Sequence, residues 1–305
     1  MHLVIPFVAT RRLRGCESMA RTLLKPLFVL LQYHISNLLS SARGPCTFDR
    51  MTHIRNNTGA LLPLLNSADA GLKMIELRPF AGLGHASHGW LDAVHHFSFG
   101  AYHDPARMGW GRIRVWNDDT IAPHSGFPPH SHRDMEIVTF VRSGAITHQD
   151  SLGNQGRTSA GDVQVMSAGS GITHAEFNQE DEATTLFQIW IETDSVGNAP
   201  QWSQREFPRG TRTGRWEVLA SDQPGADNAL PIRADARIMA ASLAAGETIT
   251  LDLDPQRHQY LVAPVGRIVL GAITAQPRDG LAITGEPRLT LIALDAAEVV
   301  LVDAR

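Results

Sequence analysis

Four residues are spaced as two pairs of potential metal ligands. His130 and His132 form the first pair, and His174 and Glu176 form the second. In a β-strand, side chains at positions i and i+2 point to the same face. Two neighbouring strands would therefore direct three imidazoles and one carboxylate at a single point. This donor set suits iron, nickel, copper, manganese, cobalt or zinc, and it leaves positions open for water or a substrate.

The elements that must position these pairs are short strands separated by turns. Runs rich in β-branched and aromatic residues predict strands at 136–142, 184–192, 236–242 and 298–303. Many short strands without helices between them favour an all-β sandwich or barrel. Glycines at 161, 169 and 171 allow the tight turns that would return the second ligand pair to the side of the first.

The segments that carry the two pairs resemble the two motifs of a cupin. The first reads GFPPHSHRDMEIVTFVRSG (126–144), and the second reads GDVQVMSAGSGITHAEFN (161–178). Their HxH and HxE pairs are similar to the ligand pattern of the pirin family. The resemblance is greatest to the bacterial pirin-like quercetin 2,3-dioxygenases. It covers residues 74–105, 114–119 and 186–192, and continues more weakly to the C-terminus.

This resemblance implies an all-β bicupin, with two jelly-roll-like β-barrels. Residues 74–208 would form an N-terminal cupin that binds metal through His130, His132, His174 and Glu176. Residues 209–305 would form a C-terminal cupin without a metal site. The sequence agrees with the second expectation, because His258 is the only histidine between 236 and 303 and this half has no HxH or HxE pair.

The resemblance also implies a metal-dependent dioxygenase that cleaves flavonols such as quercetin with dioxygen and releases carbon monoxide. Glu176 would be the catalytic base. One divalent metal is expected, Fe(II) first, with nickel, copper, manganese, cobalt or zinc as alternatives. A different interpretation is a non-enzymatic, metal-bound regulator that contacts a transcription factor or a metabolic enzyme. A third is a cupin isomerase or storage barrel, in which a structural ion would be closed to ligands.

Several further residues have open assignments. In an unbroken strand, Glu136 would share the face of His132 and hydrogen bond to a ligand imidazole. Direct ligation and a structural ion pair are the alternatives for Glu136. Other histidines are expected in turns, on the surface or in the core: His85, His88, His95, His96, His103, His124 and His148. Four tryptophans are expected in the core, with one or more lining a pocket for an aromatic ligand: Trp90, Trp110, Trp116 and Trp190.

Residues 1–73 differ in composition from the rest of the chain. They carry a net charge of +6, whereas residues 74–305 carry −10, and the acidic body argues against direct binding to nucleic acid. The apolar run at 23–39 is too short and too interrupted to span a membrane. We expect a disordered extension or a short helix before a true start at Met74, and we weigh a targeting segment as the alternative. Both cysteines, Cys16 and Cys46, fall in this stretch, so the body fits a reducing cytoplasm.

Overall fold

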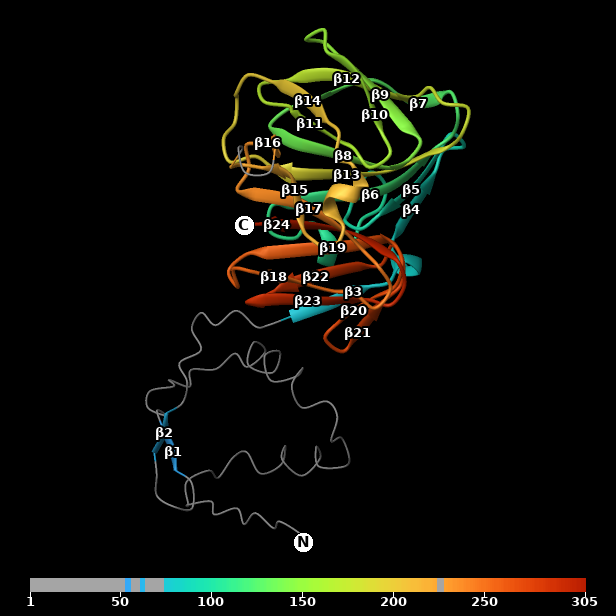
Figure 1. The fold of residues 1–305 in the computed structure, drawn as a ribbon. Helices are drawn as coiled ribbons and strands as arrows, with labels where there is room; N and C mark the ends of the chain where they lie inside the picture. The colour runs from blue at the N-terminus through green and yellow to red at the C-terminus, as the bar shows by residue number, and fades with distance from the viewer. Residues whose placement is uncertain (1–52, 56–60, 64–73, 224–227) are drawn as a thin grey trace, which may run out of the picture. The chain divides into compact units, whose positions relative to one another are not determined.

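The structure is a computed structural model that describes residues 53–55, 61–63, 74–223 and 228–305 (Figure 1). In the N-terminal extension, β1 (His53–Arg55) and β2 (Leu61–Pro63) form an antiparallel pair. The remainder of the expected extension, with both cysteines and Met1, lies outside the described residues. Among the residues described, no helix has the length and apolar character needed to cross a membrane.

The described body, from Met74 onward, consists of strands joined by turns and three short 3-10 helices. The first barrel contains β4 (Gly84–Ser87), β5 (Leu91–His95), β6 (Ile113–Ile121), β7 (Ser125–His132), β8 (Met135–Ser143), β9 (Ala145–Asp150), β10 (Gln155–Ser159), β11 (Val163–Ser167), β12 (Ile172–Asn178), β13 (Thr184–Glu192) and β14 (Gln201–Arg205). The second contains β3 (Met74–Arg78), β15 (Glu217–Ser221), β16 (Leu230–Pro231), β17 (Ala236–Leu243), β18 (Thr248–Asp252), β19 (His258–Val265), β20 (Ile268–Leu270), β21 (Ile273–Ala275), β22 (Gly280–Thr284), β23 (Arg288–Ala293) and β24 (Ala297–Ala304). The helices are η1 (Phe80–Gly82), η2 (Pro105–Arg107) and η3 (Arg209–Arg212).

Each barrel is built from a large and a small sheet (Figure 1), and the described strands pair antiparallel except for the parallel pair of β15 and β16 in the second barrel. In the first barrel, the small sheet has the order β10-β9-β12-β7 and the large sheet has the order β14-β11-β8-β13-β6-β5-β4. The second barrel combines the order β16-β15-β17-β24-β19-β22-β3 with β18-β23-β20-β21. The expected all-β fold with two cupin barrels is therefore confirmed, and the four predicted strands correspond to β8, β13, β17 and β24.

The first strand of the body belongs to the other barrel. Residue 74 and its successors were expected in the N-terminal cupin, whereas β3 pairs along its whole length with β22 of the C-terminal one. Both the first and the last strand of the described body, β3 and β24, therefore belong to the second barrel, where β3 forms an edge of the large sheet.

The interior of the second barrel is apolar, whereas the interior of the first barrel also contains buried polar side chains. The second barrel is filled by one apolar cluster that includes Met239, Leu261 and Leu301. In the first barrel, apolar side chains form two smaller clusters, one around Ile121 and another around Ile172. Burying a polar group costs free energy unless the group is hydrogen-bonded or binds a ligand. The polar residues inside the first barrel are therefore candidates for a functional site.

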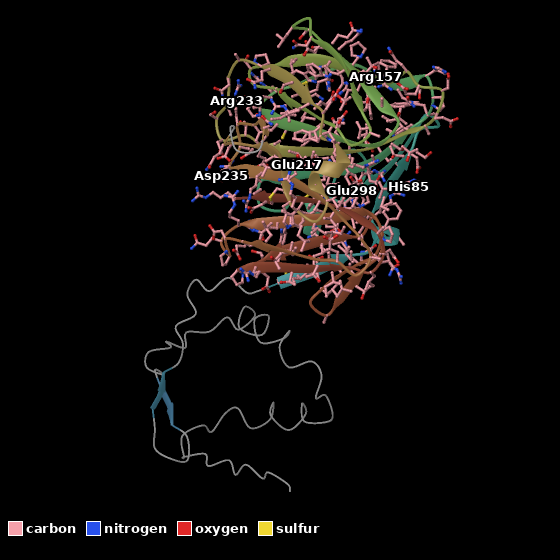
Figure 2. The ribbon with its side chains drawn as sticks, viewed as in Figure 1. His85, Arg157, Glu217, Arg233, Asp235 and Glu298 are labelled. Atoms are coloured by element: carbon pink, nitrogen blue, oxygen red, sulfur yellow. The ribbon has the colours of Figure 1, made fainter. Side chains whose placement is uncertain are left out.

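A fourth cluster joins the two barrels through large buried side chains, among them Trp116, Phe140 and Tyr260. Polar contacts reinforce this interface. The buried Arg212 side chain binds Glu298 of β24 at 2.6 Å and also donates to the Gly161 carbonyl of the first barrel at 3.2 Å. Figure 2 shows Glu298 among the side chains where the barrels meet. These apolar and polar contacts hold the two barrels together.

Candidate metal centre

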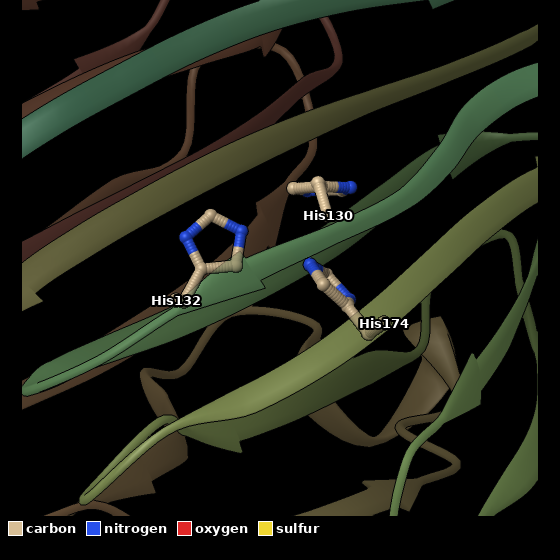
Figure 3. A group of neighbouring side chains, drawn as sticks. All are labelled: His130, His132 and His174. Carbon is tan, nitrogen blue, oxygen red and sulfur yellow. The ribbon is translucent and has the colours of Figure 1, made fainter.

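The strands β7 and β12 bring three histidines together. His130 lies directly opposite His174 in the antiparallel pair, and His132 follows two residues along β7. The ring centroids are 4.4 Å apart for His130 and His174, 4.8 Å for His130 and His132, and 5.0 Å for His132 and His174. The rings therefore group beside one another, two from one strand and one from its neighbour (Figure 3).

Two of these imidazoles are oriented by neighbours. His130 Nδ1 donates to the Pro128 carbonyl at 2.8 Å, and because a carbonyl only accepts, the lone pair of this ring is on Nε2. The His132 ring packs edge-to-face on Trp190 with centroids 4.9 Å apart. Burial, followed by the charge of His130, lowers the pKa of His132 to about 4, so its imidazole is neutral near pH 7.

His174 is held by a chain of hydrogen bonds from β9. Its Nδ1 lies 3.4 Å from Nδ1 of His148, and Nε2 of His148 lies 3.2 Å from the Asp150 carboxylate. The His148 ring is also stacked on Trp202 of β14, with centroids 4.7 Å apart and an interplanar angle of 7°. Three residues from two further strands thus fix the position of one candidate ligand.

The directions of these bonds follow from the chemistry of the groups. Burial lowers the pKa of His148, so this imidazole carries one proton, which Nε2 donates to Asp150. His148 Nδ1 must then accept, and His174 Nδ1 must donate. The lone pair of His174 is left on Nε2, a buried nitrogen without a hydrogen-bond partner. Burial and then the neighbouring imidazoles lower the pKa of His174 to about 2, which keeps this lone pair free.

Glu176 lies one inward position further along β12, in a second group with His148 and His174. A β-bulge separates His174 from Glu176, but both side chains stay buried. Gln164 and Gln188 donate to the two carboxylate oxygens at 2.6 and 2.7 Å. Burial raises the pKa of Glu176 to about 7, against the opposing effect of these hydrogen bonds. The candidate ligand atoms of each group lie within 4.8 Å of one another, and His174 belongs to both groups.

Glu136 takes no part in this arrangement, contrary to the main expectation. The strand is not continuous from His132, because β7 ends there and Asp134, with a φ of +48°, begins the turn into β8. Thr139 of β8 faces Glu176, and Glu136 lies three positions away on the opposite face. Its carboxylate accepts a hydrogen bond from Ser167 at 2.5 Å. A contact with a ligand imidazole is therefore wrong for Glu136.

A cavity of about 260 Å³ lies inside the same barrel beside the histidines. Its wall includes Phe127, whose ring is 6.1 Å from that of His130, and Phe99, which packs on Trp190. Gln188 forms another part of the wall and also holds Glu176. The remaining wall combines small and aliphatic residues with four polar side chains, those of His88, His95, Asn117 and Asp119. The cavity therefore suits a small aromatic ligand next to the candidate metal ligands.

The other histidines lie in several places. His95 lines the cavity, where its Nδ1 donates to Asn117 at 2.8 Å, whereas the adjacent His96 contacts Tyr260 between the barrels. His85 and His124 form exposed pairs with aspartates. His148 is the site residue that the sequence analysis missed. The signal was its spacing from Asp150, which is again i, i+2 on a strand next to a ligand strand.

Known proteins resemble this chain along the whole body. Residues 77–191 match the family described as Pirin, and residues 218–304 match the quercetinase C-terminal cupin domain. A pirin-like protein of Caulobacter vibrioides is 58% identical over 231 residues, which are 76% of this chain and 100% of that protein. The quercetin 2,3-dioxygenase of Escherichia coli K12 is 39% identical over 231 residues, 75% of this chain and 98% of the relative.

A solved structure agrees with these matches. The bacterial pirin of Escherichia coli in complex with nickel(II) has a TM-score of 0.72 and 38% identity, and the match covers 76% of this chain and 99% of that one. The two family matches fall on the first and second barrels in turn. On the strength of the relatives matched over nearly their full length, this chain is a bicupin that belongs to the pirin family.

Proposed function

We propose that the protein is a metal-dependent dioxygenase that opens the central ring of flavonols such as quercetin. The observation that carries this proposal is that two residues in the cavity wall contact candidate ligands. The Phe127 ring lies beside His130, and Gln188 donates a hydrogen bond to Glu176. The name of the Escherichia coli relative supports the same substrate and dioxygen.

The residues present fit a divalent transition metal. His130, His132, His174 and Glu176 would hold it, and the unpartnered Nε2 of buried His174 is a nitrogen that such a metal would satisfy. Fe(II) is the proposed occupant, and the nickel complex of a relative makes nickel the first alternative. When bound, a metal of this kind would lower the pKa of a substrate hydroxyl and favour reaction with dioxygen.

Glu176 would accept the proton of the flavonol 3-hydroxyl. Its Oε2 is the oxygen held by Gln188, the residue that also faces the cavity. In the absence of a metal, burial raises the pKa of this carboxyl to about 7, which makes the carboxylate a better base than an exposed glutamate. Gln164 on the other oxygen keeps the carboxylate from rotating.

The cavity would hold the planar substrate and exclude water from the reacting carbons. The overall reaction balances without a further reductant. The two atoms of dioxygen bond to C2 and C4 of the deprotonated flavonol, the C2–C3 and C3–C4 bonds break, and C3 leaves with its own oxygen as carbon monoxide. The proton taken by Glu176 returns to the product, an ester of two phenolic acids.

The test is a turnover assay on protein loaded separately with each first-row divalent metal. Quercetin absorbance and carbon monoxide are followed under air, with the His132→Ala variant as the matched control. We expect release of carbon monoxide in step with loss of quercetin, and none from the variant, which should also lose its stoichiometric metal. Absence of turnover with every metal would rule out the proposed reaction.

A further inference from the structure

Asp119 is a buried carboxyl that nothing described above explains. Side chains alternate along β6, so Asn117 and Asp119 face the interior of the first barrel, where both line the cavity. Asp118, between them, points the other way and binds Arg142 and Arg278. The structure thus provides a partnered carboxylate outside the barrel and a second carboxyl inside it.

The residues directly across the sheet from Asp119 are apolar. Its partners across the sheet are Ala93 on β5 and Leu186 on β13, neither of which has a polar side chain. The residue is 1% exposed, and its Oδ1 has no hydrogen-bond partner. Asn117 differs, because its side-chain oxygen accepts from His95. A buried carboxyl oxygen without a partner is costly, and a ligand in the cavity would be able to satisfy it.

We propose that Asp119 binds a hydroxyl of a planar polyphenol in this cavity, and thereby selects hydroxylated ligands over unsubstituted ones of the same shape. The proposal takes its ligand class from the proposed function, but it concerns recognition and not turnover. Asp119 is a specificity-determining residue in this account, and the reacting atoms remain on the side of Gln188 and Glu176.

The chemistry of the carboxyl matches a phenolic hydroxyl. Burial first, and then the charges of Asp118 and Glu176, raise the pKa of Asp119 well above its ordinary value. A carboxyl accepts a hydrogen bond from a phenolic hydroxyl in either protonation state, and a protonated carboxyl can also donate one to the phenolic oxygen. The rings of Phe99 and Phe127 in the cavity wall offer contacts for the faces and edges of an aromatic ligand.

Binding measurements without oxygen test this proposal independently of turnover. The probes are quercetin and 3-hydroxyflavone, which keeps the 3-hydroxyl and the carbonyl but lacks the other hydroxyls. The metal-loaded wild type is compared with Asp119→Leu, Asp119→Ala and Asp119→Asn. Asp92→Asn is the matched control, since Asp92 lies on the neighbouring strand β5, is exposed and binds His85. Alanine is included beside leucine because it is smaller, so a loss of binding seen in both variants is not caused by a steric clash of the leucine side chain.

We expect the wild type to prefer quercetin. The leucine and alanine variants should bind quercetin roughly ten- to hundredfold more weakly, and 3-hydroxyflavone as tightly as before or more so. Asp119→Asn should keep the preference, because an amide also donates and accepts, and Asp92→Asn should behave as the wild type. A loss shared by both ligands, an unchanged preference in the apolar variants, or a preference lost equally in Asp119→Asn would overturn the proposal.

The outcome is separable from that of the proposed function. Binding that depends on Asp119 in a protein that releases no carbon monoxide would leave this inference standing and remove the proposed reaction. If the protein releases carbon monoxide but the Asp119 variants bind both flavonols as the wild type does, the proposed reaction stands and the role of Asp119 is excluded. A wild type that binds neither flavonol overturns both.

Discussion

His148 Nδ1 lies 3.4 Å from Nδ1 of His174, so a candidate metal ligand on one strand is held by an imidazole from the next. We predict that His148→Phe lowers metal affinity by about 10–100-fold, the range typical for partners that orient a ligand. Phenylalanine keeps the stacking on Trp202 and removes both ring nitrogens. Competition with a chelator of known affinity measures the change.

The control for this substitution is His124→Phe, which removes an exposed imidazole paired with Asp181. This variant should bind metal as the wild type does. If His148→Phe also retains full affinity, the hydrogen bonds from β9 do not orient His174, and the contact is only packing.

The grouping of His130 and His132 with His174 was predictable from the sequence because each proposed pair of ligands lies within a single strand. A period of two holds along β7 from His130 to His132, and it survives the bulge between His174 and Glu176. His148 was not predictable in the same way, because its position depends on the pairing of β9 with β12. Alternation says which face a residue occupies, but it does not say which strands are neighbours.

The face of Glu136 was mispredicted for a related reason. The period of two was continued across the turn at Asp134, where the positive φ ends β7 and β8 restarts the alternation. We therefore predict that Glu136→Gln leaves metal affinity unchanged. The free energy of unfolding should fall by no more than about 1.5 kcal/mol, because the amide oxygen still accepts from Ser167. Metal titration and urea unfolding measure the two effects.

Glu176→Gln is the matched comparison, since it makes the same chemical change inside the barrel. It should weaken metal binding, because Glu176 lies in the cluster with His174. Equal weakening in the two variants would show that Glu136 acts on the metal after all.

Gly126 controls the spacing between the two ligand strands. It pairs with Phe177, and a Cβ at this position would overlap the Glu176 carbonyl oxygen and the Phe177 Cα. We predict that Gly126→Ala separates β7 from β12, costs roughly 1–3 kcal/mol of stability, and weakens metal binding through the contact between His130 and His174. Thermal unfolding and metal titration report the two effects.

Gly82→Ala serves as the control for this substitution, because a Cβ there meets nothing within 4 Å and its φ is not positive. Its stability and metal affinity should equal those of the wild type. Unimpaired metal binding in Gly126→Ala would mean that β7 can shift without moving its histidines.

His96, at the interface between the barrels, should make the free energy of unfolding depend on pH. It is fully buried, and its Nδ1 and the Tyr260 hydroxyl are 2.9 Å apart. Burial, followed by the charge of nearby arginines such as Arg78, lowers the pKa of His96 to about 3. The unfolded chain binds this proton at the ordinary histidine pKa of about 6.5, whereas the folded chain does not.

The free energy of unfolding should therefore fall as the pH falls from about 6.5 towards 3. Above pH 6.5, His96 is neutral in both states and does not make the free energy of unfolding depend on pH. For one proton bound only by the unfolded chain, the slope is about 1.4 kcal/mol per pH unit. Other buried histidines also contribute to the pH dependence of the free energy of unfolding. The prediction therefore concerns the difference in this pH dependence between the wild type and His96→Phe. Urea unfolding of both proteins between pH 8 and pH 5 should show parallel behaviour above 6.5 and a shallower decline for the variant below it. Parallel curves over the whole range would mean that His96 is protonated in the folded protein as readily as in the unfolded chain.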